Sequence, residues 1–125
     1  MKYGHHLTFE ELRNANIARA GRWHPGGLGD WSIADWAVAL LGEAGEACNA
    51  IKKLRRVEDG IANLSATAER QLSTKEDARA AIAEELADTQ IYLDLLAARL
   101  DIDLEAVVRE KFNRVSVRYG FPERL

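Results

Sequence analysis

The chain has 125 residues and a formal net charge of -3 at pH 7, a length that fits one domain (residues 1–125) with a core that needs no disulfides. The acidic balance argues against a nucleic-acid-binding module, no apolar run is long enough to span a bilayer, and the N-terminus lacks the apolar stretch of a signal peptide. The single cysteine, Cys48, cannot form an intrachain disulfide, and we expect its small side chain to be buried. A chain without an intrachain disulfide fits the reducing cytoplasm, where we expect the protein.

Two helices are predicted in the first half of the chain, and no strand pattern appears anywhere. The capping-box sequence Thr8-Phe9-Glu10-Glu11 predicts the start of a helix that runs to Trp23. The Pro/Gly-rich stretch 24–29 ends it. A second helix is predicted from Asp30 or Ser32 to Arg56.

Two further helices follow a long connection, residues 57–72. The third is predicted from Ser73, with a capping box in Ser73-Thr74-Lys75-Glu76, to Leu100. The fourth runs from an Asp103 N-cap to Tyr119, with Gly120 as its left-handed stop. The connection is either functional or mobile, and a short helix over 66–72 is an alternative. We therefore predict an all-α antiparallel bundle of about four helices, in which helices two and three face each other.

Acidic residues interrupt the apolar faces of helices two and three. Each face follows a helical period of 3 and 4 residues, which we call a seam. The first seam is Ile33, Trp36, Leu40, Glu43, Ala47, Ala50 and Leu54, and the second is Ala78, Ile82, Glu85, Thr89, Tyr92 and Leu96. Glu46 and Asp88 lie one turn after the two seam glutamates. Four converging carboxylates suit a hard cation such as Mg²⁺, with Mn²⁺ as an alternative. Acidic pairs of this spacing also occur on solvated helix faces.

Basic residues form a stripe on helix four, Lys111, Arg114 and Arg118. They either complement the helix dipole or hold phosphates. The apolar residues of this helix, Leu104, Val107, Val108, Phe112 and Val115, are expected to be its packing side. Lys53, in the basic end of helix two, is a further substrate-binding candidate.

Aromatic residues surround the Pro/Gly-rich turn. Trp36 is expected in the core, whereas Trp23 and Trp31 either join the core or stack on a nucleobase. Asn16 is either a hydrogen-bonding partner for a base edge or an exposed helix residue. No Glu-x-x-His motif is present, which argues against a di-iron bundle.

Three segments together give a family resemblance: WAVALLGEAGEACNAIKK (residues 36–53), EELAD (residues 84–88) and KFNRVS (residues 111–116). From about Asp30 onwards the chain resembles the MazG-like all-α nucleoside triphosphate pyrophosphohydrolases. The resemblance implies a helical bundle that assembles as dimers or tetramers. It also implies a nucleoside triphosphate as substrate, which is converted with Mg²⁺ to the monophosphate and pyrophosphate in nucleotide-pool cleaning.

Carried over residue by residue, the resemblance makes four acidic residues the metal ligands: Glu43, Glu46, Glu85 and Asp88. It places Lys111, Asn113 and Arg114 at the phosphates and Tyr92 towards the substrate. Glu46 is our candidate general base. The 57–72 connection is longer than is usual in the family.

Two predictions concern the whole protein. The apolar residues of helix one need a surface to cover, so we expect a homo-oligomer; they are Phe9, Leu12, Ile17, Ala20 and Trp23. The alternative to an enzyme is a non-catalytic helical module that binds nucleotides or another protein.

Overall fold

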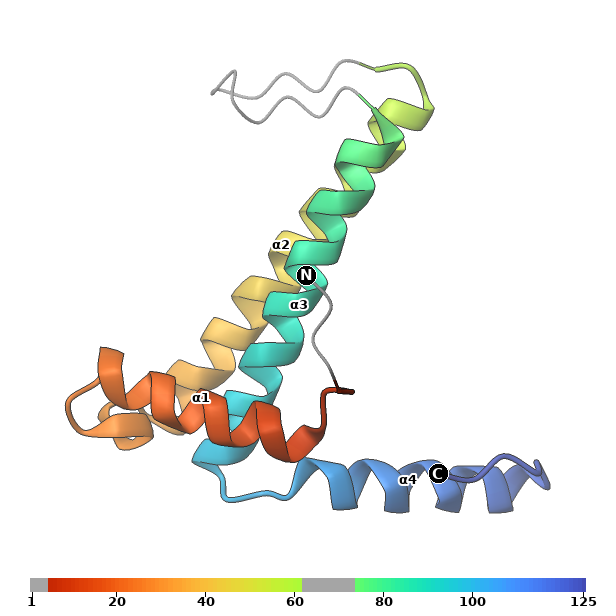
Figure 1. Ribbon diagram of the computed structural model, residues 1–125. Helices are drawn as coiled ribbons and strands as arrows, with labels where there is room; N and C mark the ends of the chain where they lie inside the picture. The colour runs from red at the N-terminus through yellow and green to blue at the C-terminus, as the bar shows by residue number, and fades with distance from the viewer. Residues whose placement is uncertain (1–4, 62–73) are drawn as a thin grey trace. The chain divides into compact units, whose positions relative to one another are not determined.

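The computed structural model describes residues 5–61 and 74–125, and these ranges are all-helical, without a strand (Figure 1). The elements are α1 (Phe9–Trp23), the 3-10 turn η1 (Gly27–Asp30), α2 (Ile33–Glu58), α3 (Lys75–Arg99) and α4 (Leu104–Tyr119). The all-α prediction is confirmed. Across the described ranges, none of these helices combines the length and the apolar character that crossing a membrane requires.

Local side-chain chemistry sets several helix ends where they were predicted. At the start of α1, the Thr8 hydroxyl accepts from the backbone N–H of Glu11, and the Glu11 carboxylate accepts from the backbone N–H of Thr8. The Asp103 carboxylate caps α4 by accepting from the backbone N–H of Ala106. Gly120 ends α4 at φ 70°, a left-handed conformation that glycine adopts without a steric penalty.

Two helix ends differ from the prediction. The hydroxyl of Thr74 accepts from the first turn of α3, at 3.0 Å from the backbone nitrogen of Asp77, and the helix begins at Lys75. Helix α2 continues to Glu58, two residues beyond the predicted end, so residues 57 and 58 belong to the helix and not to the connection. Ser73 itself and the alternative helix over 66–72 lie outside the described residues.

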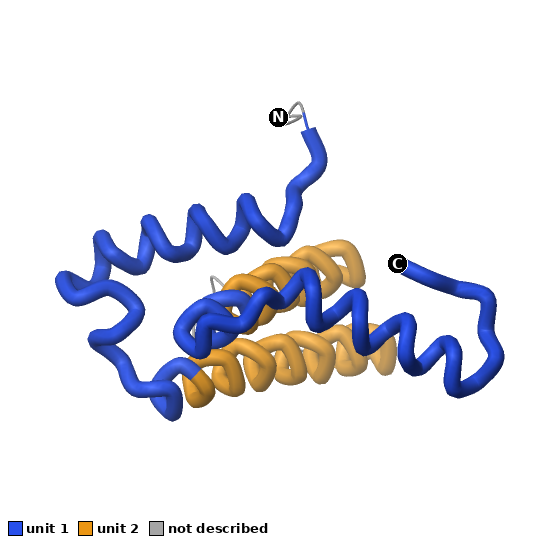
Figure 2. The backbone as a smooth tube through the Cα atoms, turned by 90° about the horizontal axis from the view of Figure 1, so that it is seen from below, with its two compact units in different colours: residues 1–36, 94–125 blue, residues 37–93 orange. Residues whose placement is uncertain are grey.

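The chain divides into two compact units, coloured separately in Figure 2. One unit, Ala37–Leu93, contains most of α2 and α3, which run antiparallel and side by side. Its buried side chains are small: Ala47, Ala50 and Ala78 are 5%, 6% and 0% exposed. All three are seam positions, so the predicted facing sides are confirmed at these residues, whereas Ile33, the first residue of the first seam, is 45% exposed.

The other unit consists of the chain up to Trp36 together with Asp94–Leu125. Trp36 is buried, as predicted, and its indole N–H donates to the carbonyl of Leu28 at 2.9 Å. Ala20, Leu95 and Ala97 are the other buried apolar residues described in this unit.

Several apolar residues that were expected to be buried are exposed. Cys48 is exposed, which contradicts its assignment as a buried hydrophobe, and Trp23 is 64% exposed, which contradicts a core position. On α4 the predicted packing side is wrong for three residues, since Val107, Val108 and Phe112 are 43%, 38% and 43% exposed. Helical period alone predicts which residues share a face, but it does not predict whether the chain supplies a partner for that face.

Candidate metal centre

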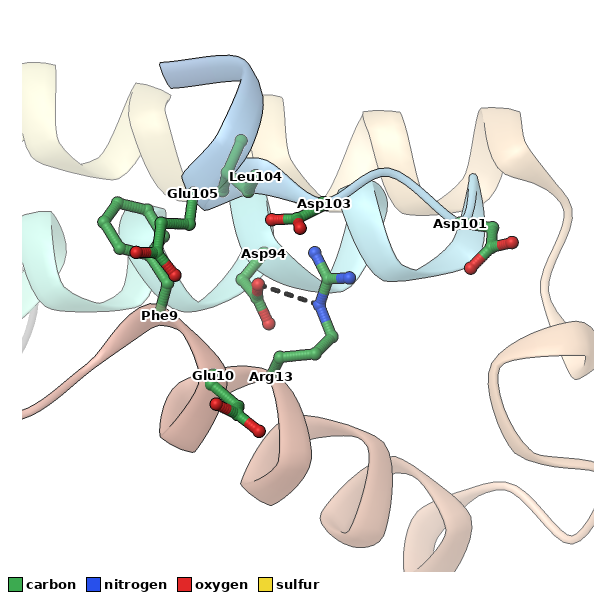
Figure 3. A pocket seen from close by; sticks show the side chains of 8 residues that line it. All are labelled: Phe9, Glu10, Arg13, Asp94, Asp101, Asp103, Leu104 and Glu105. Atoms are coloured by element: carbon green, nitrogen blue, oxygen red, sulfur yellow. Dashed lines mark hydrogen bonds and ion pairs between the residues drawn. The ribbon is translucent and has the colours of Figure 1, made fainter. Parts of the chain in front are cut away.

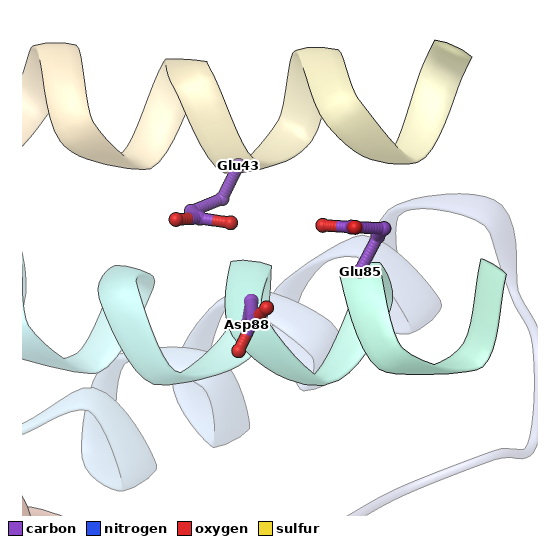
Figure 4. Close-up of side chains that lie close together, drawn as sticks. All are labelled: Glu43, Glu85 and Asp88. Atoms are coloured by element: carbon purple, nitrogen blue, oxygen red, sulfur yellow. The ribbon is translucent and has the colours of Figure 1, made fainter. Parts of the chain in front are cut away.

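The acidic residues of the two seams meet between α2 and α3, within the Ala37–Leu93 unit. Oxygen atoms of Glu43, Glu85 and Asp88 all lie within 4.8 Å of one another. Figure 4 shows Glu43 reaching from α2 towards α3, and the other two side chains on α3. Three of the four predicted ligands therefore form one cluster, because each glutamate takes a seam position that faces the opposite helix.

Glu46, the fourth predicted ligand, is not part of this triplet. It lies one turn after Glu43 and is exposed. Its charge nevertheless acts on the cluster, because it helps to raise the pKa of both Glu43 and Glu85.

Burial and mutual repulsion disfavour the charged forms of both seam glutamates. Desolvation is the main cause that raises the pKa of Glu43 above its ordinary value of 4.5, and the charges of Asp88 and Glu46 add to it. Desolvation is also the main cause that raises the pKa of Glu85, and the charges of Glu46, Asp88 and Glu43 add to it. A cation bound at this point would relieve the same repulsion that protonation relieves.

One oxygen of the cluster is both buried and unsatisfied. Within residues 5–61 and 74–125, Glu85 Oε2 has no hydrogen-bond partner, although water does not reach it. A buried carboxylate oxygen without a partner costs free energy unless a cation or a donor binds it. Together with three oxygen donors within 4.8 Å, this orphaned oxygen fits a hard divalent cation.

The glycines beside Glu43 do not serve close helix packing. A side-chain carbon added at Gly42 or Gly45 would meet no atom within 4 Å, and both residues are exposed. Close helix approach is therefore not the reason for glycine here, and open space lies next to the first acidic pair.

The predicted substrate residues divide between the two units. Lys53 and Tyr92 share the unit of the acidic cluster, and both are partly buried and engaged in interactions. The residues predicted on α4, α1 and the Pro/Gly-rich turn belong to the other unit, and they are Asn16, Trp23, Trp31, Lys111, Asn113, Arg114 and Arg118.

On α4, two of the predicted phosphate-binding residues already have partners. Arg114 forms an exposed ion pair with Glu110 at 2.9 Å. Asn113 accepts at 2.9 Å from the backbone N–H of Leu125. Lys111 and Arg118 are exposed and form no ion pair within residues 5–61 and 74–125.

Asn16 is neither exposed nor directed to solvent. It is 2% exposed, and its amide donates to Asp94 Oδ2 at 3.0 Å, so its assignment as an exposed helix residue is wrong. Trp31 is 37% exposed and packs its ring against Trp36, with centroids 4.7 Å apart. Trp23 lies under the guanidinium group of Arg19 at 5.2 Å.

Sequence reasoning missed the buried acid Asp94. It is 1% exposed and accepts from Arg13 Nε at 3.0 Å and from Asn16, which joins α1 to the end of α3. A signal was present, because Asp94 is the only charged residue between Ile91 and Leu96. The ion pair opens onto a cavity of about 340 Å³ (Figure 3).

Comparison with known proteins adds one similarity. No protein-family model matches the chain. The chain is 32% identical over 81 residues to the "Gene 37 protein" of Mycobacterium phage L5. The match covers 65% of this chain and 60% of the phage protein, so the chain spans less than two thirds of its relative's length. The relative's name states no activity.

Proposed function

We propose that the protein is a Mg²⁺-dependent nucleoside triphosphate pyrophosphohydrolase, which converts a (deoxy)nucleoside triphosphate to the monophosphate and pyrophosphate in nucleotide-pool cleaning. The observation that carries the proposal is the carboxylate cluster of Glu43, Glu85 and Asp88, with its orphaned buried oxygen. The sequence resemblance to the MazG-like superfamily supplies the substrate class. Neither the family comparison nor the phage relative bears on the reaction.

Glu43, Glu85 and Asp88 would hold the cation. All three offer oxygen ligands, which Mg²⁺ and Mn²⁺ prefer. When bound, Mg²⁺ supplies positive charge that neutralises phosphate oxygens and orients the triphosphate. Glu85 Oε2 would thereby gain the partner that it lacks within the described part of the chain.

Glu46 is the proposed general base. It is exposed, so a water molecule can reach it, and its charge acts on both Glu43 and Glu85 of the cluster. In the proposed reaction Glu46 takes a proton from the attacking water. A bond forms between that water oxygen and phosphorus, the phosphoanhydride bond between the α- and β-phosphates breaks, and pyrophosphate leaves.

Cationic side chains would hold the phosphates. Lys53 is on α2, in the same unit as the cluster, and Tyr92 follows Asp88 by one turn of α3. On α4 we assign the phosphate contacts to Lys111, Arg114 and Arg118, of which Arg114 would exchange Glu110 for a phosphate. Trp23 offers an exposed ring for stacking on a base, whereas Asn16 is committed to Asp94 and is withdrawn from the substrate set.

Pyrophosphate release from a panel of ribo- and deoxyribonucleoside triphosphates tests the proposal. We expect release from at least one nucleotide with Mg²⁺, and none with EDTA. Glu85→Gln should abolish the release, whereas Glu84→Gln, which changes the exposed neighbour on the same helix, should leave it intact. Binding of nucleotides without release from any of them would instead support a non-catalytic nucleotide-binding module.

A further inference from the structure

The chain turns back on itself after α4. Gly120 ends the helix in a left-handed conformation, and the backbone N–H of Phe121 donates to the carbonyl of Ser116 at 2.9 Å. The following residues run back along α4, which belongs to the same compact unit (Figures 1 and 2). We call residues 121–125 the return segment.

Asn113 holds the far end of the return segment with both polar atoms of its side-chain amide. Its Oδ1 accepts from the backbone N–H of Leu125 at 2.9 Å, and its Nδ2 donates to the main-chain oxygen of Leu125 at 3.4 Å. The first contact is the shorter, so it is the stronger of the two. Because one amide binds one residue as both acceptor and donor, the contact fixes the orientation of the segment as well as its position.

The return segment also holds its own shape. Arg124 Nη1 donates to the carbonyls of Phe121 and Glu123, at 2.8 Å and 2.7 Å. The ring of Phe121 stacks on that of Tyr119, with centroids 5.9 Å apart. Every residue of the segment is exposed. Hydrogen bonds and this ring pair, rather than burial, therefore keep the segment on α4.

Asn113 lies on a different side of α4 from the basic stripe. Residues two apart on a helix do not face each other, so Asn113 and Lys111 point to different sides. Lys111 and Arg118 are two turns apart and share one side. The return segment binds the other side, at Asn113 and at Ser116, which is 5% exposed. Asn113 is therefore badly placed to bind the same phosphate oxygens as Lys111.

The last turn of α4 depends on contacts that come from beyond the helix. The last four carbonyls of a helix have no partner inside it, and such turns open locally unless other groups bind them. Here the backbone N–H of Gly120 binds the carbonyls of Ser116 and Val117. The N–H of Phe121, in the return segment, also donates to Ser116. Arg118 lies in this turn, so its position depends on the turn remaining helical.

We propose that Asn113 is a positioning residue for phosphate binding and not itself a phosphate contact. By fastening the return segment, Asn113 keeps the last turns of α4 helical. It thereby holds Arg114 and Arg118 in the orientation that the phosphates need. The role in phosphate binding rests on the proposed function, whereas the fastening of the segment does not.

Hydrogen exchange measures the fastening without nucleotide or Mg²⁺. In Asn113→Ala we expect the backbone amides of residues 117–120 to exchange about threefold to tenfold faster, and amides elsewhere to exchange as in wild type. Alanine is a better helix former than asparagine, so faster exchange would oppose the intrinsic helix propensity and would come from the loss of the return segment. Leu125→Pro, which lacks the N–H that Asn113 binds, should give the same increase. Leu125→Ala is the matched control: it keeps that N–H and removes a side chain that is 60% exposed, so it should behave as wild type.

Turnover measures the consequence for phosphate binding. Asn113→Ala and Leu125→Pro should each raise KM for the best nucleotide of the panel about fivefold and leave kcat within about twofold, because the carboxylate cluster is unchanged. The double variant should have the same KM as either single variant, since both changes release the same contact.

Three results would each overturn the proposal: unchanged exchange in both single variants, an unchanged KM, or KM effects that multiply in the double variant. The last result would mean that Asn113 touches the phosphates directly. If the wild type releases no pyrophosphate from any nucleotide, the proposed function fails, and the exchange comparison still decides whether Asn113 fastens the return segment.

Discussion

At the scale of single residues, Glu85 determines most of the chemistry proposed for this chain. Its side chain occupies a seam position that would ordinarily be apolar, the nearby charge of Glu46 helps to raise its pKa, and one of its oxygens is buried without a partner among the described residues. A side chain in this position destabilises the folded protein unless a proton or a cation neutralises it. The two predictions at this scale follow from that cost.

Removing the two seam charges should stabilise the protein in the absence of metal. In Glu43→Gln/Glu85→Gln the repulsion with Asp88 disappears, so in EDTA at pH 7 we expect the melting temperature to rise by roughly 2–5 °C. Wild type should gain stability on addition of Mg²⁺, by about 1.4 kcal/mol at ten times the Kd, and the variant should gain none. If the variant responds to Mg²⁺ as wild type does, the cation binds elsewhere. Glu84→Gln serves as the control.

The same two residues predict how stability depends on pH. Because the folded-state pKa values of Glu43 and Glu85 are raised above 4.5, the folded protein binds more protons than the unfolded chain above that pH. Their contribution to stability is complete below pH 4.5 and is lost as pH rises through the raised values. The advantage of Glu43→Gln/Glu85→Gln should therefore be small at pH 4 and grow towards pH 7 in melting curves with EDTA. An advantage independent of pH would contradict the cause given for both shifts.

At the scale of secondary-structure elements, the Asp94 network joins α1 to α3. Asp94 accepts from both Arg13 and Asn16, and Arg13 also donates at 2.8 Å to the carbonyl of Ile102, just before α4. Removal of one partner from a buried pair leaves the others without compensation.

We expect Asp94→Ala to lower the free energy of unfolding by about 2–4 kcal/mol, as measured by denaturant unfolding. Asp59→Ala, which breaks the exposed Arg55–Asp59 pair, should cost at most about 0.5 kcal/mol. Equal losses of unfolding free energy in Asp94→Ala and Asp59→Ala would contradict the claim that burial strengthens the Asp94 network.

On α4, two arginines in similar ion pairs separate phosphate binding from helix stability. Arg114 pairs with Glu110 and Arg109 pairs with Glu105, each four residues away and exposed. Alanine at either position should cost about 0.3–0.5 kcal/mol of stability. We expect Arg114→Ala to lower kcat/KM tenfold or more, which is about 1.4 kcal/mol, and Arg109→Ala to change it little. Unchanged turnover of Arg114→Ala would contradict the proposed phosphate contact of Arg114.

The sequence predicts a feature of these helices when the interactions that cause it lie between residues close together in the chain. Thr8, Asp103 and Gly120 act on backbone groups within three or four residues, and their roles are confirmed. The inward-facing positions of α2 and α3 also follow from helical period. Asn16 could not be assigned because its partner, Asp94, is 78 residues away in sequence.

The local sequence pattern also fails to predict burial, because burial needs a second surface that covers the helix face. The period of α4 groups Val107, Val108 and Phe112 correctly, yet they remain exposed in the single chain. At the candidate site, the i,i+3 spacing predicts that Glu43 and Glu46 share a helix face, but not that Glu43 joins the triplet while Glu46 stays outside it. That division depends on the register between α2 and α3, which neither helix specifies alone.

At the scale of the whole molecule, the account separates cation binding from phosphate binding. The carboxylate cluster on α2 and α3 fits a divalent cation, and cationic residues of α4 are the proposed phosphate contacts. Cation binding can be tested without a nucleotide, whereas turnover tests both.

The central claim is that a cation held by this cluster drives triphosphate hydrolysis, and a Mg²⁺ titration of pyrophosphate release tests it most directly. With the best nucleotide of the panel held constant, wild type and Glu84→Gln should give the same saturable dependence on Mg²⁺. Asp88→Asn should need at least tenfold more Mg²⁺ or lose activity, because one of three ligands is gone. Release that does not depend on Mg²⁺, or an identical titration for Asp88→Asn and wild type, would contradict the account.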